Sequence, residues 1–190
     1  FGFWTRQPDG KLIYTSLSDT IKNKILDDEQ FWNILKYDQW ILFQSLNRIY
    51  IYDTKTGQFK IIAPKNGVVK SFASKNAIYF QTLKEGLFEI ESGKAKLVSD
   101  DPVLKKFTIA NVFTTDEGLL IPTQLDGIYK LAGNVLTPVS TDVDAELKSS
   151  FVYSSQRLQD GSFALGTVSN GIFILSENGK LKYHLTQSKG

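Results

Sequence analysis

The sequence lacks cysteine and methionine and contains a single histidine, His184. Without cysteine the chain can form no disulfide, no thiolate metal site and no cysteine nucleophile. A histidine-rich metal site is excluded because it needs several imidazoles. A Ser–His–Asp triad would have to use His184, which falls in the outermost strand of a repeat described below. We therefore expect a surface histidine without a catalytic role.

Strong charge and long apolar runs are also missing. The net charge is +2, and the longest basic cluster is the pair Lys105 and Lys106. Because nucleic-acid-binding proteins usually carry a basic stripe, we expect no nucleic-acid binding by these residues. No apolar run approaches the roughly 18 residues of a membrane-spanning helix, so we expect no membrane contact by them either.

Familiar cofactor motifs are absent as well. The stretch GTVSNG at 166–171 lacks the lysine and the following helix of a phosphate-binding loop. Calcium loops of alternating Asp and Asn do not occur. We therefore predict no catalytic, metal-binding or cofactor-binding residues, and the sequence leaves the ligand-binding residues unassigned.

What the chain does contain is an internal repeat. Its 190 residues are 42% hydrophobic and 13% aromatic, which is typical of a globular protein. A similar stretch occurs at 2–16, 48–62, 86–98, 127–139 and 171–185. One aromatic marks each copy, and these are Trp4, Tyr50, Phe88, Tyr129 and Phe173. Their spacings of 46, 38, 41 and 44 residues indicate a repeat protein.

A second strand pair precedes each of the four later copies. These pairs read WNILKYD and WILFQS, VKSFASK and AIYFQT, NVFTTDE and GLLIPTQ, and VYSSQRLQD and SFALGT. A unit of four short antiparallel strands in about 42 residues is typical of a propeller blade. We predict an all-β chain: a β-propeller fragment of about four four-stranded blades plus an N-terminal half blade. A β-sandwich with accidental similarity and a solenoid are less favoured alternatives.

The repeat also predicts where the half blade and each blade begin and end. The chain begins with Phe1 and enters a strand at once, so we expect a piece of a longer protein. We predict one partial propeller over 1–190, with a half blade at 1–20 and blades at 31–64, 68–99, 107–140 and 150–187.

The turn before each marker strand has a recurring composition. Gly86, Gly127 and Gly171 follow Glu85, Asp126 and Asn170, a pattern typical of turns with positive φ. In the first complete copy Arg48 replaces the glycine, and we expect a different turn there. The hydroxyl residues Ser45, Thr82, Thr123 and Thr167 are expected to cap backbone groups at the strand ends.

The segments between blades are longer and polar, and each could hold a helical turn. Asp101 before Pro102, and Thr141 before Asp142, are expected to be helix N-caps. These connections emerge on one face of a propeller. They vary in length and composition, while the strands keep their pattern. We expect recognition to use them.

Two kinds of residue could act on a saccharide. The pairs Asp27–Asp28 and Asp100–Asp101 could serve a glycosidase. They lie in polar connections, where we expect them to cap helical turns and stay solvated. Trp32 and Trp40 could stack on a sugar ring, but we expect most aromatic residues to fill the core between blades.

The stretch SFALGTVSNGIFIL resembles the propeller repeat of two-component regulators, in which a Gly-Thr pair is followed after a turn by Gly, an aliphatic and an aromatic residue. Gly166, Thr167, Gly171, Ile172 and Phe173 fit that pattern. The other copies keep Thr and Gly-aliphatic-aromatic but lack the family's tryptophan. Over essentially all 190 residues the chain looks like the sensor propellers of Bacteroidetes-type regulators. The resemblance implies an extracytoplasmic propeller with more blades, followed by a three-tyrosine β-sandwich, a membrane helix and a DNA-binding or histidine kinase effector.

We therefore expect a non-enzymatic ligand-sensing module of a transmembrane signalling or transcription-regulating protein, with a carbohydrate as ligand. A homodimer formed through propeller faces is a further expectation. The alternatives are a propeller enzyme acting on polysaccharide, using Asp27, Asp28 or Asp101, and a protein-interaction scaffold. The sequence leaves open the ligand, the number of blades in the parent protein and the type of effector.

Overall fold

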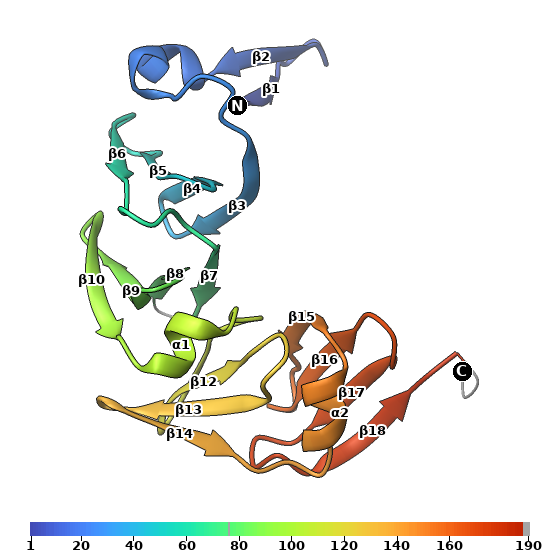
Figure 1. The fold of residues 1–190 in the computed structure, drawn as a ribbon. Coiled ribbons are helices and arrows are strands. Elements are labelled where there is room, and N and C mark those ends of the chain that lie inside the picture. The colour runs from blue at the N-terminus through green and yellow to red at the C-terminus, as the bar shows by residue number, and fades with distance from the viewer. Residues whose placement is uncertain (76, 188–190) are drawn as a thin grey trace.

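The computed structural model describes residues 1–75 and 77–187 and is built from four four-stranded antiparallel sheets and a two-stranded hairpin (Figure 1). In each sheet, strands that are consecutive in the sequence are hydrogen-bonded neighbours. The sheets follow one another around an arc, as the blades of a propeller do. The predicted fold class is confirmed.

The half blade consists of β1 (Gly2–Arg6) and β2 (Leu12–Ser16). Blade 1 consists of β3 (Phe31–Tyr37), β4 (Trp40–Ser45), β5 (Ile49–Asp53) and β6 (Phe59–Ile62). Blade 2 consists of β7 (Lys70–Ser74), β8 (Ala77–Thr82), β9 (Gly86–Glu91) and β10 (Lys94–Ser99). Blade 3 consists of β11 (Phe113–Thr115), β12 (Gly118–Pro122), β13 (Ile128–Ala132) and β14 (Val135–Val139). Blade 4 consists of β15 (Val152–Arg157), β16 (Phe163–Thr167), β17 (Ile172–Leu175) and β18 (Leu181–Leu185).

Three short helices lie in the connections between sheets. They are the 3₁₀ helix η1 (Ser18–Lys24), α1 (Pro102–Lys106) and α2 (Asp144–Ser149). At α1 the predicted cap is confirmed, because the Asp101 carboxylate accepts a hydrogen bond from the Val103 N–H at 2.9 Å. At α2 the helix begins at Asp144 and its N-cap residue is Val143, so Thr141 is not the N-cap residue, although its Oγ1 accepts from the Val143 N–H at 3.2 Å. The Asp144 carboxylate accepts from the Thr141 hydroxyl and N–H, which holds Thr141 ahead of the helix.

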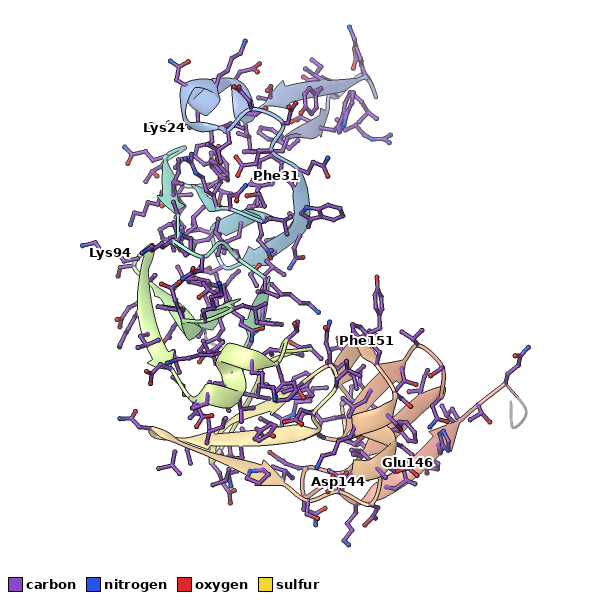
Figure 2. All side chains as sticks on the ribbon, viewed as in Figure 1. Lys24, Phe31, Lys94, Asp144, Glu146 and Phe151 are labelled. Atoms are coloured by element: carbon purple, nitrogen blue, oxygen red, sulfur yellow. The ribbon has the colours of Figure 1, made fainter. Side chains whose placement is uncertain are left out.

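The core is divided into four clusters, each at a junction between successive sheets (Figure 2). Alternate residues of a strand point to opposite faces of its sheet, so each complete blade can present apolar side chains to both neighbours. Fully buried members include Tyr50 at the first junction, Ile51 and Phe80 at the second, Leu87 and Ile121 at the third, and Leu165 and Phe173 at the fourth.

The first strand of a blade lines the concave side of the arc, and the last strand lies on the convex side (Figure 1). Because the strands alternate in direction, the turns between second and third strands share one face with the connections between blades. Backbone hydrogen bonds join the two sets: Val68 N–H donates to Leu46 O, and Val168 N–H to Phe151 O. We call this the connection face. The remaining turns form the opposite face, called the turn face.

The predicted turn glycines adopt the expected conformation. Gly86, Gly127 and Gly171 have φ of 115°, 88° and 70°. At Gly171 a Cβ atom would lie 2.1 Å from Leu185 O, so that turn requires glycine for its close approach as well. At the copy that lacks glycine, Ser45 Oγ accepts from the N–H groups of Asn47 and Arg48, which gives the different turn expected there.

The hydroxyl residues cap backbone groups at three of the four turns. Thr123 Oγ1 donates to Gly127 O, and Thr167 Oγ1 donates to Gly171 O. Ser45 Oγ caps its turn as an acceptor, from the N–H groups of Asn47 and Arg48, since its hydrogen goes to the Glu29 carboxylate. At Thr82 the expected cap of a backbone group is not found, because this hydroxyl donates to the Glu85 carboxylate; at the equivalent place of the next turn, the Asp126 carboxylate accepts from the Tyr129 hydroxyl instead.

Candidate functional site

A polar pocket opens on the turn face, where the first strands of blades 2, 3 and 4 end. Its volume is about 520 Å³. Ser74 and Lys75 come from the end of β7, Thr114 and Asp116 from the end of β11, and Gln156 and Arg157 from the end of β15. The pocket therefore lies on the concave side of the arc and is shared by three blades.

Hydrogen bonds between neighbouring first strands hold the pocket wall together. Ser74 Oγ accepts from the Thr114 N–H at 2.8 Å and lies 2.8 Å from Thr114 Oγ1. Asn111 Nδ2 donates to Ser155 O at 3.0 Å, which joins β15 to the segment before β11. Since β-strand residues support these groups, the pocket has a rigid polar wall.

Arg157 is the most constrained cation of the pocket. Its Nη1 donates to Thr114 O at 2.7 Å, and its guanidinium lies over the Phe163 ring, 5.5 Å from the centroid. Glu177 Oε2 lies 3.6 Å from Nη2. These contacts fix the orientation of the guanidinium plane, and its remaining N–H groups are available to an oxygen-rich ligand.

One buried polar atom of β15, outside the pocket lining, has no partner among the described residues. Ser155 Oγ is shielded from solvent and makes no hydrogen bond, although the Ser155 carbonyl accepts from Asn111. A buried hydroxyl of this kind usually marks a water or ligand position. The lining as a whole offers hydroxyl, amide, cationic and carboxylate groups, which suits a small ligand with many hydrogen-bonding groups.

Lys70 lies on the same β7 strand, nearer the connection face. Its Nζ donates to Ala110 O at 2.9 Å and lies over the Phe72 ring. Burial lowers the pKa of Lys70 from its ordinary value. Its charge therefore faces the next blade and lies outside the pocket lining.

The paired carboxylates lie in separate connections and have no common site. Asp27 and Asp28 are exposed residues of the connection between η1 and β3. Asp100 and Asp101 precede α1, where Asp100 pairs with Lys105 at 3.1 Å and Asp101 caps the helix. Blades 1 and 2 lie between the two pairs along the chain.

Trp32 and Trp40 differ in their exposure to solvent. Trp40 packs against the core between blades 1 and 2, as predicted for most aromatic residues. Trp32 is 64% exposed, so that expectation is wrong for this residue. Burial along β3 alternates regularly, and Trp32 lies on the exposed face of the strand together with Ile34 and Lys36.

His184, predicted as a surface histidine, lies in the outermost strand β18 and is half-buried. Its ring stacks on Phe173, with centroids 4.3 Å apart, and its Nε2 lies 2.8 Å from Asn170 O. Because a carbonyl can only accept, Nε2 carries the hydrogen. These contacts hold His184 as a packing residue of blade 4.

Sequence reasoning did not identify the pocket residues. Ser74, Thr114 and Arg157 are about 40 residues apart and belong to no catalytic motif. The available signal was positional, since each ends the first strand of a predicted blade. Within residues 1–75 and 77–187, no group of three His, Asp or Glu side chains could hold a metal ion, and no helix is long and apolar enough to cross a membrane.

Comparison with known proteins identifies similar folds but no family. The sequence matches no protein-family model and no curated protein. The extracellular domain of the putative one component system BT4673 from B. thetaiotaomicron has a TM-score of 0.61 over 85% of this chain, at 15% identity. The extracellular domain of the putative hybrid two component system BT3049 from the same organism has a TM-score of 0.56 over 98%, at 17% identity.

The similarity extends to propellers with other roles. YCF48, in a structure with a bound D1 peptide, has a TM-score of 0.60 over 94% of this chain, at 11% identity. This chain spans 23%, 24% and 60% of the BT4673, BT3049 and YCF48 chains. At these identities the likeness establishes the propeller fold, and it includes extracellular domains of sensor systems.

Proposed function

We propose that this chain is a non-enzymatic ligand-sensing module of a transmembrane signal-transduction or transcription-regulator protein, located on the extracytoplasmic side. The pocket shared by blades 2, 3 and 4 is the observation that carries the proposal. A ligand held there contacts three blades at once, so its binding energy depends on their relative arrangement. Such differential affinity is what a sensor needs to shift a conformational equilibrium.

A carbohydrate is the proposed ligand. Sugars present many hydroxyl groups, which the amide and hydroxyl side chains of the pocket can bind. The cations Lys75 and Arg157 favour a sugar that also carries an acidic group. The likeness to extracellular domains of the BT4673 and BT3049 systems supports the location and the sensor role.

The observed roles of the carboxylates support a module without catalysis. Asp101 caps α1, Asp100 pairs with Lys105, and Asp27 and Asp28 lie in another connection. A glycosidase would need two carboxyl groups roughly 5–10 Å apart in one cleft. The homodimer through propeller faces stays a prediction, which sedimentation analysis of the chain would test.

The test is a thermal-shift screen of neutral and acidic mono- and oligosaccharides. A ligand at 100 times its Kd should stabilise the chain by about 2.7 kcal/mol. Lys75→Ala and Gln159→Ala, both in the pocket lining, should weaken binding at least fivefold, as measured by calorimetry. Gln58→Ala, in an exposed turn of blade 1, is the control and should bind like the wild type. No stabilisation by any saccharide would overturn the carbohydrate proposal, and unchanged binding in the pocket variants would overturn the site.

A further inference from the structure

A second cavity adjoins the pocket on the turn face. It has a volume of about 470 Å³ and lies between blades 3 and 4. Thr115 and Asp116, in the turn between β11 and β12, line both cavities. The other lining residues come from β12, β13, β14 and the turn between β17 and β18. We call this second space the outer cavity, because it lies farther from the first strands than the pocket does.

Part of the outer cavity is apolar and continuous with the core. Leu120 of β12 belongs to the cluster between blades 3 and 4, and Val139 packs against that cluster. Lys130 pairs with Leu120 across β12 and β13, so its side chain lies on the same face of blade 3. Aliphatic side chains of this kind favour contact with apolar groups, such as the C–H groups on the face of a sugar ring.

The walls of the outer cavity are fixed by hydrogen bonds. On the blade 3 side, Thr115 Oγ1 donates to Gly118 O at 3.1 Å and accepts from the Glu117 N–H at 3.3 Å. On the blade 4 side, the side-chain oxygen of Asn178 accepts from the Ser176 hydroxyl at 2.6 Å. A side-chain amide has two N–H donors, so Asn178 can still donate to a hydroxyl of a ligand.

The two cavities differ in charge. The pocket is lined by two cations and one carboxylate, which are Lys75, Arg157 and Asp116. The outer cavity is lined by three carboxylates and one cation, which are Asp116, Glu117, Glu177 and Lys130. Lys130 is paired with Glu117, which takes up its charge. An anionic group is therefore favoured in the pocket and disfavoured in the outer cavity.

One ion pair joins the two linings. Arg157 lines the pocket, and Glu177 lines the outer cavity with Oε2 3.6 Å from Arg157 Nη2. The two side chains are 36% and 51% exposed, so the pair is weak. Arg157 keeps its position without this pair, because Thr114 O and the Phe163 ring hold its guanidinium. A carboxylate of a ligand in the pocket can thus replace Glu177 at Nη2.

The turn that carries Glu177 is held independently of Arg157. The Asp142 N–H donates to Gly179 O at 3.2 Å. The Asp142 carboxylate accepts from the Leu181 N–H at 3.0 Å. Because these bonds fix the far side of the turn, the Glu177 side chain can leave Arg157 while the wall of the outer cavity stays in place.

We propose that the pocket and the outer cavity form one elongated site, which takes a saccharide with an acidic ring in the pocket and an uncharged ring in the outer cavity. Glu177 determines this order of rings. Its carboxylate competes with that of the ligand for Arg157, and its charge excludes a second acidic ring from the outer cavity. This assignment rests on the carbohydrate-sensing function proposed above and adds the length and charge order of the ligand.

The test compares three kinds of probe by calorimetry. Glucuronic and galacturonic acid are each used alone, linked to a neutral sugar (the mixed disaccharide) and linked to a second uronic acid (the doubly acidic disaccharide). The mixed disaccharide should bind about tenfold tighter than the uronic acid alone, because its second ring gains contacts in the outer cavity. The doubly acidic disaccharide should gain less than about twofold, because its second ring meets like charge.

Two variants separate the parts of the site. Asn178→Ala should weaken binding of the mixed disaccharide about fivefold and leave that of the uronic acid alone unchanged. Glu177→Gln removes the competitor at Arg157, so the uronic acid alone should bind about two- to fivefold tighter. Glu91→Gln, which breaks the exposed pair with Lys96 in blade 2, is the matched control and should bind like the wild type.

The outcomes distinguish this site from the function on which it rests. If the uronic acids bind but the mixed disaccharides bind no tighter, the elongated site is wrong and the pocket remains. Unchanged affinity of the uronic acid in Glu177→Gln would overturn the competing role of Glu177. If none of the saccharides binds, the carbohydrate proposal and the elongated site both fail.

Discussion

At the scale of single residues, hydrogen bonds of side-chain oxygens at the strand ends stabilise the turns and the junctions between blades. The glycine and hydroxyl positions could be predicted because they recur at the same place in each repeat. The departure at Thr82 could not be predicted, because Thr123 keeps its bond to the backbone although Asp126, another carboxylate, occupies the place of Glu85. A periodic pattern predicts what the copies share and says little about substitutions within one copy.

The connection before blade 1 contains a hydrogen-bonded group that periodicity did not reveal. The Glu29 carboxylate accepts from the hydroxyls of Ser45 and Tyr50. The Tyr50 side chain is buried in the core between the half blade and blade 1. Burial, together with the hydrogen bond to Glu29, raises the pKa of Tyr50 to about 12.

This shift predicts a loss of stability in alkaline solution. The fold favours the neutral phenol, so its contribution is complete below the ordinary pKa of about 10 and is lost as the pH rises towards 12. The free energy of unfolding, measured by urea titration between pH 9 and 12, should therefore fall. Tyr50→Phe should reduce that slope by up to about 1.4 kcal/mol per pH unit, the value for one proton.

Two further variants serve as a second test and as a control in the urea titrations at alkaline pH. The pKa of Tyr129 also rises to about 12, through burial and its hydrogen bond to Asp126, so Tyr129→Phe should reduce the slope in the same way. Tyr183→Phe removes the hydroxyl of an exposed side chain on β18 and is the matched control. An identical slope in wild type and Tyr50→Phe would contradict the assignment.

At the scale of elements, strands were predicted more accurately than connections. The predicted strands at 40–45 and 77–82 coincide with β4 and β8, because their composition and bounding turns are local signals. The start of α2 was misplaced because the helix begins at Asp144, although the Thr141 hydroxyl does accept from the Val143 N–H just ahead of it. The way in which α1 is held to blade 2 also depends on a residue distant in sequence, which no local pattern indicates.

That residue is Gln81, a fully buried side chain at the end of β8. Its Nε2 donates to Leu104 O and Phe107 O at 2.8 and 2.7 Å, and its Oε1 accepts from the Ile109 N–H at 2.8 Å. One side chain thus satisfies three backbone groups of the α1 connection. Gln44 has a similar role at blade 1, where its Oε1 accepts from the Ser71 N–H.

Replacing Gln81 should lower the free energy of unfolding more than replacing an exposed glutamine does. Gln81→Leu keeps a similar volume but leaves buried backbone groups unpaired, and we expect a loss of roughly 2–4 kcal/mol in the free energy of unfolding. Gln58→Leu, in an exposed turn, should change it by less than about 0.5 kcal/mol. Similar losses for the two variants in urea unfolding would show that the bonds to α1 contribute little.

At the scale of the whole molecule, the repeat predicted the architecture but not the pocket. The fold follows from five copies of one strand pattern, each a local signal. The pocket forms from the ends of three strands that belong to different blades. Its polar character depends on Ser74, Thr114 and Arg157, three different side chains near the ends of equivalent strands. The site therefore depends on packing between repeats, which no single copy encodes.

The arrangement of cores predicts an order of local stability. Blades 2 and 3 have a sheet packed against both faces, while the half blade packs on one neighbour and exposes most of its side chains. In amide hydrogen exchange at neutral pH, β1 and β2 should therefore exchange first and the central strands of blades 2 and 3 last. Blade 4, with one packed neighbour, should fall between them. Uniform protection across the sheets would indicate a single cooperative unit instead.

The division of the core into separate clusters also has a mechanical consequence. Because each sheet packs on the next, the blades bear a load applied between the two ends of the chain in series. Every junction would then carry the same pulling force, and the half blade, which exposes most of its side chains, would detach before the inner sheets. The chain would then lengthen in discrete steps of about one repeat, and each step would measure the strength of a single junction.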